Sequence, residues 1–182
     1  MQRFIDIIIE NVRSINLERS KIDEFITLLD GANAVFVLGI GRSGFVARAF
    51  SMRLMHLGYR SFVVGETITP RIGKGDLLIA ISGSGETGYV VAFSKKAKDL
   101  GAKVIGVTSS ENSSLARLSD LVIVLKSKFG KEIANIAPLG TIFELTAMIF
   151  FDSMVAEIME RKKLMEEDLA KRHSIENEVV IW

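Results

Sequence analysis

The chain has 182 residues, of which 48% are hydrophobic and 25% charged, and this is the composition of a single globular domain with a full core. Its formal net charge of +1 gives no indication of a nucleic acid or a membrane surface as a partner. The absence of cysteine excludes disulfides, a thiol nucleophile and cysteine metal sites, and two histidines are too few for a histidine-rich metal site.

The N-terminal segment carries acidic and basic residues throughout and lacks the uninterrupted apolar core of a signal peptide. Its apolar residues recur at helical spacing, which predicts one amphipathic helix over residues 3–29 that ends before Gly31. The most apolar later stretch, residues 145–159, is interrupted by Asp152 and Glu157 and is too short to span a bilayer. We therefore expect a soluble, cytoplasmic protein without a membrane or nucleic-acid partner.

Five short apolar runs follow the first helix, and each is continuous rather than alternating, as in strands that are buried on both faces of a parallel sheet. The runs are residues 34–39, 61–65, 77–82, 103–108 and 121–125. Helical patterns separate several of them, in "RSGFVARAFSMRLMHLG", "ETGYVVAFSKKAKDLG" and "SSLARLSD". Alternation of strand and helix predicts an α/β fold: a three-layer αβα sandwich with a five-stranded parallel, doubly wound, flavodoxin-like sheet.

The C-terminal third predicts a long helix over about residues 139–165, followed by a tail with a short helix and an extended end. We expect this helical segment, about 139–175, to pack on the core or at a subunit interface, like the N-terminal helix. The chain has no internal repeat, low-complexity tract or linker, so residues 1–182 are expected to form a single domain.

A glycine-rich loop follows the first predicted strand. In "GIGRSG", Gly39, Gly41 and Gly44 have the spacing of the dinucleotide fingerprint, in which the backbone approaches a phosphate closely and a helix N-terminus favours the anion. Glu66 lies 22 residues after Gly44, where such a site holds its ribose, so an NAD-binding protein is one interpretation.

A second loop, "SGSGET", follows the third predicted strand and changes this interpretation. Its hydroxyls, together with that of Ser43, would offer up to four donors to one terminal phosphate. The alternative is that these residues serve only as turn and helix-cap residues. Because ligands bind beyond the carboxyl ends of parallel strands, two such loops favour a phosphate ester. The predicted phosphate-binding residues are Gly41, Arg42, Ser43, Ser82, Gly83, Ser84, Gly85, Glu86 and Thr87.

The two loops resemble those of the sugar isomerase (SIS) domain family, whose members bind phosphosugars, over about residues 35–125. "SMRLMHLGY" (51–59), "APLGTIFE" (137–144) and "RHSIE" (172–176) resemble the 6-phospho-3-hexuloisomerases within it. The resemblance implies conversion of D-arabino-hex-3-ulose 6-phosphate to D-fructose 6-phosphate, a step of the ribulose monophosphate pathway. It also implies a homotetramer and an isomerase that uses no cofactor and no metal.

Such an isomerase needs a base, a second group that moves a proton between two oxygens, and a phosphate anchor. Glu144 is the candidate base, because it lies among apolar residues in the first turns of the long helix. It would equally serve as an N-terminal acid that stabilises the helix dipole, and the resemblance favours the catalytic role. Related aminosugar isomerases place their glutamate earlier in a similar segment, which leaves Glu132 as an alternative.

His173 is the candidate proton shuttle, because an imidazole both gives and takes a proton near neutral pH. The alternative is a solvated surface histidine. In SIS isomerases a histidine often reaches the active site from a neighbouring subunit, and whether His173 acts within or across subunits stays open. His56 ends a predicted helix and is interpreted as structural. Arg42 would pair with the phosphate or hold its loop in shape.

Two other functions remain open at this point. One is a different phosphosugar isomerase, such as one that acts on arabinose 5-phosphate. The other is a phosphosugar sensor without catalysis.

Overall fold

The computed structural model describes residues 1–127 and 131–173 of the chain, and its centre is a five-stranded parallel sheet. The strand order is β2-β1-β3-β4-β5, which is the flavodoxin-like order and confirms the predicted doubly wound α/β sheet. The strands are β1 (Val35–Gly39), β2 (Ser61–Val63), β3 (Leu77–Ile81), β4 (Lys103–Thr108) and β5 (Leu121–Val124).

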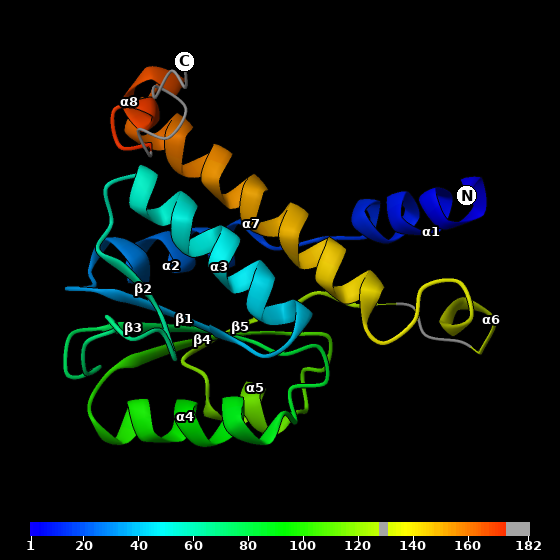
Figure 1. The fold of residues 1–182 in the computed structure, drawn as a ribbon, viewed down its shortest axis with the longest axis horizontal. Helices are drawn as coiled ribbons and strands as arrows, with labels where there is room; N and C mark the ends of the chain where they lie inside the picture. Colours follow the sequence, from blue (N-terminus) through cyan, green and yellow to red (C-terminus); the bar gives the residue numbers. More distant parts are fainter. Residues whose placement is uncertain (128–130, 174–182) are drawn as a thin grey trace, which may run out of the picture.

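Helices cover both faces of the sheet and complete the predicted three-layer sandwich (Figure 1). One face carries α2 (Arg19–Asp30), α3 (Arg42–His56) and α7 (Thr141–Lys162), and the other carries α4 (Gly88–Asp99) and α5 (Ser114–Leu118). The short helix α8 (Glu166–Ala170) packs near the C-terminal end of α3, while α1 (Gln2–Arg13) packs on α7. A single further turn, α6 (Lys131–Ala134), precedes α7 and was not predicted.

The central strands β1 and β3 are apolar because each of their faces contributes to a separate core. Val35 and Val37 of β1 pack with α2, α3 and α7, whereas Phe36 and Leu38 of the same strand pack with α4 and α5. All of these side chains are at most 1% exposed. The continuous apolar pattern therefore predicted the strands correctly, since it reflects burial on both sides.

The N-terminal segment differs from the predicted single helix over residues 3–29, because it forms α1 and α2 with a break between them. The Ser14 hydroxyl donates a hydrogen bond to the Asn11 carbonyl at 2.6 Å and α1 ends there. Ile15 and Leu17, in the break, pack against the core. Helical spacing continues through this segment, but local side-chain bonding and core contacts interrupt the helix.

The C-terminal helices follow the prediction more closely. α7 spans 22 residues, within the predicted 139–165, and Lys163 in the left-handed conformation ends it before α8. The extended end predicted beyond residue 173 lies outside the described residues. Within residues 1–127 and 131–173, no helix combines the length and the hydrophobicity that a bilayer crossing requires.

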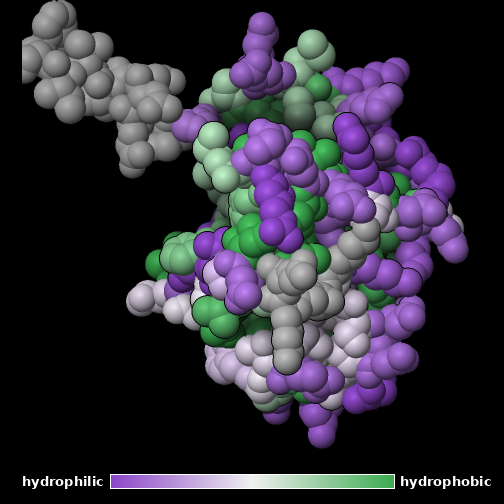
Figure 2. Space-filling model, turned by 90° about the vertical axis from the view of Figure 1, so that its right-hand side faces the viewer, coloured by the Kyte–Doolittle hydropathy of each residue, from purple (hydrophilic) through white to green (hydrophobic). Residues whose placement is uncertain are grey.

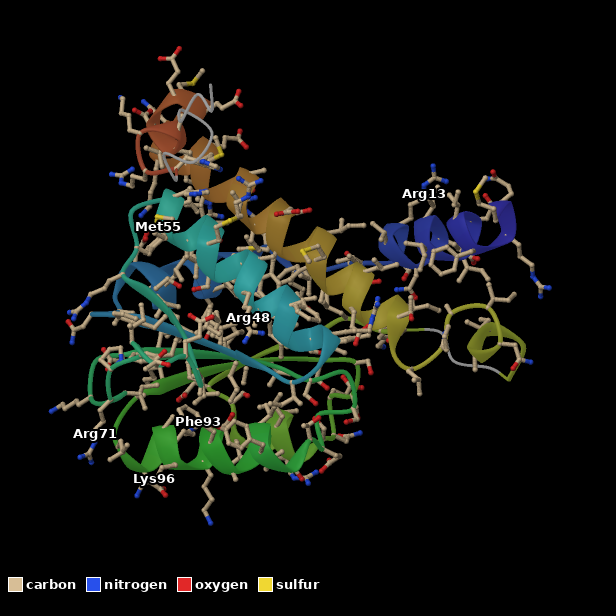
Figure 3. All side chains as sticks on the ribbon, viewed as in Figure 1. Arg13, Arg48, Met55, Arg71, Phe93 and Lys96 are labelled. Atoms are coloured by element: carbon tan, nitrogen blue, oxygen red, sulfur yellow. The ribbon has the colours of Figure 1, made fainter. Side chains whose placement is uncertain are left out.

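The carboxyl edge of the sheet is the right-hand side of Figure 1, where α3, α4 and α7 begin. Figure 2 views this side and shows hydrophilic side chains around the rim with hydrophobic ones exposed near the centre. Figure 3 places Arg48 in the middle of α3, Met55 near the C-terminal end of that helix, and Phe93 between α4 and the sheet. The two ends of α3 therefore lie at opposite edges of the sheet.

Candidate active site

The two predicted phosphate loops lie side by side at the carboxyl edge of the sheet. β1 and β3 are neighbours, and their last residues, Gly39 and Ile81, are paired in register. The first loop leads into α3 at Arg42, and the second leads into α4 at Gly88. Two helix N-termini therefore open onto one region, and their free backbone N–H groups favour an anion there.

Close packing of strand and helix accounts for two glycines of the fingerprint. A Cβ atom at Gly39 would lie 2.4 Å from the Ser43 carbonyl oxygen, and one at Gly44 would lie 2.9 Å from the Gly39 carbonyl oxygen. Glu66, the acid that a dinucleotide site would use, has its Oε1 3.3 Å from Nε of Arg48. The glycine spacing thus follows from packing that both kinds of phosphate site share.

The hydroxyls of the second loop divide into buried and exposed ones. The Ser82 hydroxyl is buried, accepts the Gly85 N–H at 3.1 Å and lies 2.9 Å from the Thr87 hydroxyl, so this pair shapes the loop. Ser84 is exposed, and its oxygen accepts the Glu86 N–H at 3.2 Å, which leaves its proton free to donate. Ser84 is therefore the hydroxyl of this loop that faces outward.

Glu86 connects the second loop to the segment that follows β4. Its carboxylate accepts the Ser114 N–H at 2.7 Å, and this hydrogen bond lowers the pKa of Glu86. The Gly83 carbonyl accepts from the Ser109 N–H at 3.0 Å, and the Gly83–Ser109 contact joins the same two segments. Both contacts hold the loop in place, so the structure gives Glu86 a partner within the protein.

Arg42 and Glu144 form an ion pair beside these loops, although they are 102 residues apart in the chain. Arg42 Nε donates to the Glu144 carboxylate, which is the one side-chain hydrogen bond of Glu144 among the described residues. Glu144 is 9% exposed, whereas the Arg42 side chain is 56% exposed. A nearly buried carboxylate is thus bound by an arginine whose side chain is more than half exposed.

The start of α7 places Glu144 next to the second loop. A Cβ atom at Gly83 would lie 3.0 Å from Cδ1 of Phe143, so the loop and the first turn of α7 touch. The Thr141 hydroxyl donates to the Pro138 carbonyl at 2.5 Å and fixes the turn ahead of the helix. The alternative base, Glu132, lies in α6, and its side chain is outside the described residues.

His173 lies at the other end of α3, away from Glu144. Its ring stacks on that of His56, with centroids 5.0 Å apart and 30° between the planes. His56 is the last residue of α3, and the 15-residue helix separates it from Arg42 by about 20 Å. Within one chain, the fold brings Glu144 to Arg42 and the phosphate loops, and it brings His173 to His56.

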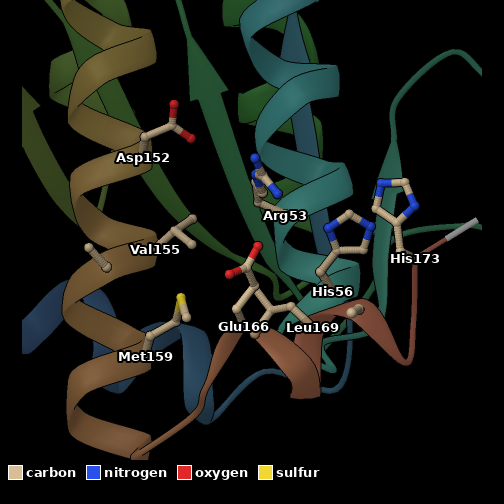
Figure 4. A pocket seen from close by; sticks show the side chains of 10 residues that line it. Arg53, His56, Asp152, Val155, Met159, Glu166, Leu169 and His173 are labelled. Atoms are coloured by element: carbon tan, nitrogen blue, oxygen red, sulfur yellow. The ribbon is translucent and has the colours of Figure 1, made fainter.

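A cavity of about 670 Å³ is lined in part by the two histidines and lies between the C-terminal parts of α3 and α7 and the helix α8 (Figure 4). His56 is 2% exposed, and burial, the neighbouring His173 and Arg53 together lower its pKa. The residues that line the cavity are Arg53, His56, Asp152, Val155, Ala156, Met159, Glu166, Leu169, Ala170 and His173.

Two pairings were not predicted from the sequence. Arg42 with Glu144 and His56 with His173 each join segments that are distant in the chain, and no local pattern marks either pair. Among residues 1–127 and 131–173, no group of three or more histidine, aspartate and glutamate side chains is arranged to hold a metal ion.

Known proteins give three findings that bear on this site. The SIS domain model matches residues 28–153. A protein named 3-hexulose-6-phosphate isomerase from Methanocaldococcus jannaschii is 45% identical over 85% of this chain and 83% of its own length. One of the same name from Methylomonas aminofaciens is 37% identical over 96% and 98%.

A solved structure agrees with these sequence relationships. It is a protein from Methanococcus jannaschii for which a function as 3-hexulose-6-phosphate isomerase has been inferred. It superposes with a TM-score of 0.85 and 41% identity, over 93% of this chain and 97% of its own.

Proposed function

The chain belongs to the SIS domain family, and we propose that it is a phosphosugar isomerase that converts D-arabino-hex-3-ulose 6-phosphate to D-fructose 6-phosphate. Relatives named for this reaction, at 35–45% identity, support the reaction class. The observation that carries the proposal is the Arg42–Glu144 pair beside two phosphate-type loops, because it joins a carboxylate base to an anion site.

The 6-phosphate is proposed to bind between the N-termini of α3 and α4. Ser84 and Ser43 would donate hydroxyl hydrogen bonds, and backbone N–H groups of both helices would add further donors. Arg42 would contribute its exposed N–H groups while Nε keeps its bond to Glu144. The buried Ser82–Thr87 pair would support the loop rather than touch the phosphate.

Glu144 is the proposed base of the reaction. It would remove the proton from C2 while the C3 carbonyl oxygen gains one, which gives a 2,3-enediol. Loss of the O2 proton then forms the C2 carbonyl, and the proton held by Glu144 returns to C3. A positioned carboxylate of this kind contributes roughly 10²–10⁴-fold to the rate of proton transfer.

His173 is the proposed group that moves protons between O3 and O2. Because it lies at the far end of α3 in its own chain, we propose that it serves the Glu144 site of a partner copy in a homo-oligomer, a tetramer by resemblance. Exposed apolar side chains on the outer side of α3 and α7, such as Met52 and Ile149, support burial against another copy.

The physiological setting is proposed on the same resemblance. We place the reaction in the ribulose monophosphate pathway, in formaldehyde fixation or pentose supply, and in the cytoplasm. The sugar chemistry requires neither a redox cofactor nor a metal.

A coupled assay tests the proposal directly. The purified chain is given D-arabino-hex-3-ulose 6-phosphate, and formation of D-fructose 6-phosphate is measured without added metal or NAD. Turnover supports the proposal. Turnover of arabinose 5-phosphate alone would identify a different isomerase, and binding of phosphosugars without turnover of any would indicate a sensor.

A further inference from the structure

Arg172 fastens the C-terminal segment to the end of α3. Its Nη1 donates to the His56 carbonyl at 3.3 Å and to the Asp168 carbonyl at 3.4 Å. These bonds connect the end of α3 to the segment after α8. Arg172 and His56 are 116 residues apart in the chain. A cation at this position also interacts favourably with the free carbonyls and the dipole of the α3 C-terminus.

The chain leaves room for this guanidinium at Gly58. A Cβ atom there would lie 3.4 Å from both Cζ and Nη2 of Arg172, so the guanidinium packs directly on the glycine. Gly58 has a φ of +92°, which side-chain-bearing residues rarely adopt. The absence of a side chain at Gly58, in the turn after α3, therefore lets the Arg172 guanidinium pack against the backbone there.

His173 comes directly after this contact. Its N–H donates to the Ala170 carbonyl at 3.0 Å, which continues the turn that Arg172 begins. Its ring stacks on His56, whose carbonyl is the one that Arg172 binds. Because the anchor and the ring belong to adjacent residues, movement of Arg172 would move the imidazole.

We propose that Arg172 is a positioning residue: its guanidinium fixes the C-terminal segment on the end of α3 and so sets the place where His173 is presented. The proposal concerns geometry, and its catalytic consequence rests on the function proposed for His173. Arg172 itself needs no contact with the substrate.

The neighbouring Lys171 provides a matched control. Its Nζ lies 3.0 Å from the Asp168 carboxylate, its side chain is 73% exposed, and among the described residues it forms no side-chain hydrogen bond or ion pair with α3. Arg172→Gln and Lys171→Gln therefore each remove one positive charge from adjacent positions, and only the first removes the anchor. Arg172→Lys keeps the charge without the planar fork of the guanidinium.

Nuclear magnetic resonance tests the geometry without reference to activity, because the chain has only two histidines. In protein with ¹³C-labelled histidine, ring-to-ring nuclear Overhauser effects are expected between His56 and His173 in the wild type and in Lys171→Gln. Arg172→Gln is expected to lose them, and Arg172→Lys to keep them in weakened form. Unchanged effects in Arg172→Gln would overturn the proposal.

Kinetics on the hexulose phosphate test the consequence. Arg172→Gln is expected to lower kcat about 10- to 100-fold, as misplacement of a reacting group does, with KM within about twofold because Arg172 is not among the proposed phosphate donors. Equal kcat in Arg172→Gln and Lys171→Gln would overturn the positioning role. A wild type that is inactive on the hexulose would instead refute the proposed function, with the resonance result standing by itself.

Discussion

The two ends of α3 carry different chemistry. The N-terminal end, at Arg42, offers free backbone N–H groups, the exposed Ser84 hydroxyl of the neighbouring loop and a nearly buried carboxylate with one guanidinium partner. The C-terminal end, at His56, offers carbonyls, two stacked imidazoles and the Arg172 guanidinium. The helix dipole favours the Glu144 carboxylate and a bound anion at the first end and the Arg172 guanidinium at the second.

This difference is the reason for proposing that the site is completed by a second copy. A helix is rigid, and the 15 residues of α3 keep its ends about 20 Å apart. The proposed anion site and the proposed base are therefore separated from the proposed proton shuttle by a fixed distance within one chain. A second copy in a two-fold arrangement would place the C-terminal end of one α3 near the N-terminal end of the other. The symmetry repeats this contact, so a pair of chains would form two complete sites.

The largest expected effect is at the N-terminal end. Glu144→Gln keeps the shape of the side chain and removes its ability to take a proton, so kcat should fall about 10²- to 10⁴-fold. Affinity for D-fructose 6-phosphate, measured by calorimetry, should stay within about threefold, since the phosphate donors remain. A near-normal rate would move the base elsewhere, and Glu132 is the next residue to replace.

Mixing variants of the two ends tests whether they meet across subunits. Glu144→Gln and His173→Asn are each expected to be nearly inactive, while a refolded equal mixture should recover activity. If sites form between paired copies, half of the pairs are mixed and each has one intact site of two, so about a quarter of wild-type activity is expected.

The control for the mixing experiment is a mixture of Glu144→Gln with Arg42→Gln. Both changes lie at the same end of α3, so no pairing of these chains yields an intact site, and no recovery is expected. Recovery equal to that of the first mixture, or no recovery in either, would contradict the arrangement across subunits.

Ser84→Ala should have a smaller effect, on binding rather than on kcat. The exposed hydroxyl is proposed to donate to a charged phosphate, and loss of such a hydrogen bond costs about 1.5 kcal/mol, or about tenfold in affinity. Calorimetry with D-fructose 6-phosphate measures it. Ser109→Ala is the control, because the Ser109 hydroxyl donates a hydrogen bond to the Gly83 carbonyl at 2.6 Å within the protein. Equal losses in both variants would mean that loop structure, not phosphate contact, is responsible.

The sheet was predicted well from the sequence because burial on both faces produces a local pattern of consecutive apolar residues. Strands such as Leu77–Ile81 are apolar at every position since both faces are covered, and the pattern is visible in a few residues. The N-terminal helix was predicted less well. Helical spacing alone does not report that the Ser14 hydroxyl ends α1 and that Ile15 turns into the core.

The residue pairs of the candidate site are not marked by any local sequence pattern. Arg42 and Glu144 meet because β1 leads into α3 and because the turn before α7 places that helix beside the second loop. Their contact therefore depends on the topology of the whole domain. His173 was singled out from its resemblance and residue type, but its position on His56 depends on how α8 folds back after α7. Local patterns thus predicted the residues, and tertiary packing decided which of them meet.

The smallest expected effect is a pH dependence of stability at the C-terminal end. Burial, His173 and Arg53 lower the pKa of His56 in the folded protein, so the unfolded chain binds more protons at this residue. Stability is then complete above about pH 6.5, the ordinary value for histidine, and decreases as the pH falls below it. Wild-type Tm should drop more between pH 8 and pH 5.5 than that of His56→Gln. Ser43→Ala, at the other end of α3, should keep the wild-type dependence, and an unchanged dependence in His56→Gln would place the titrating group elsewhere.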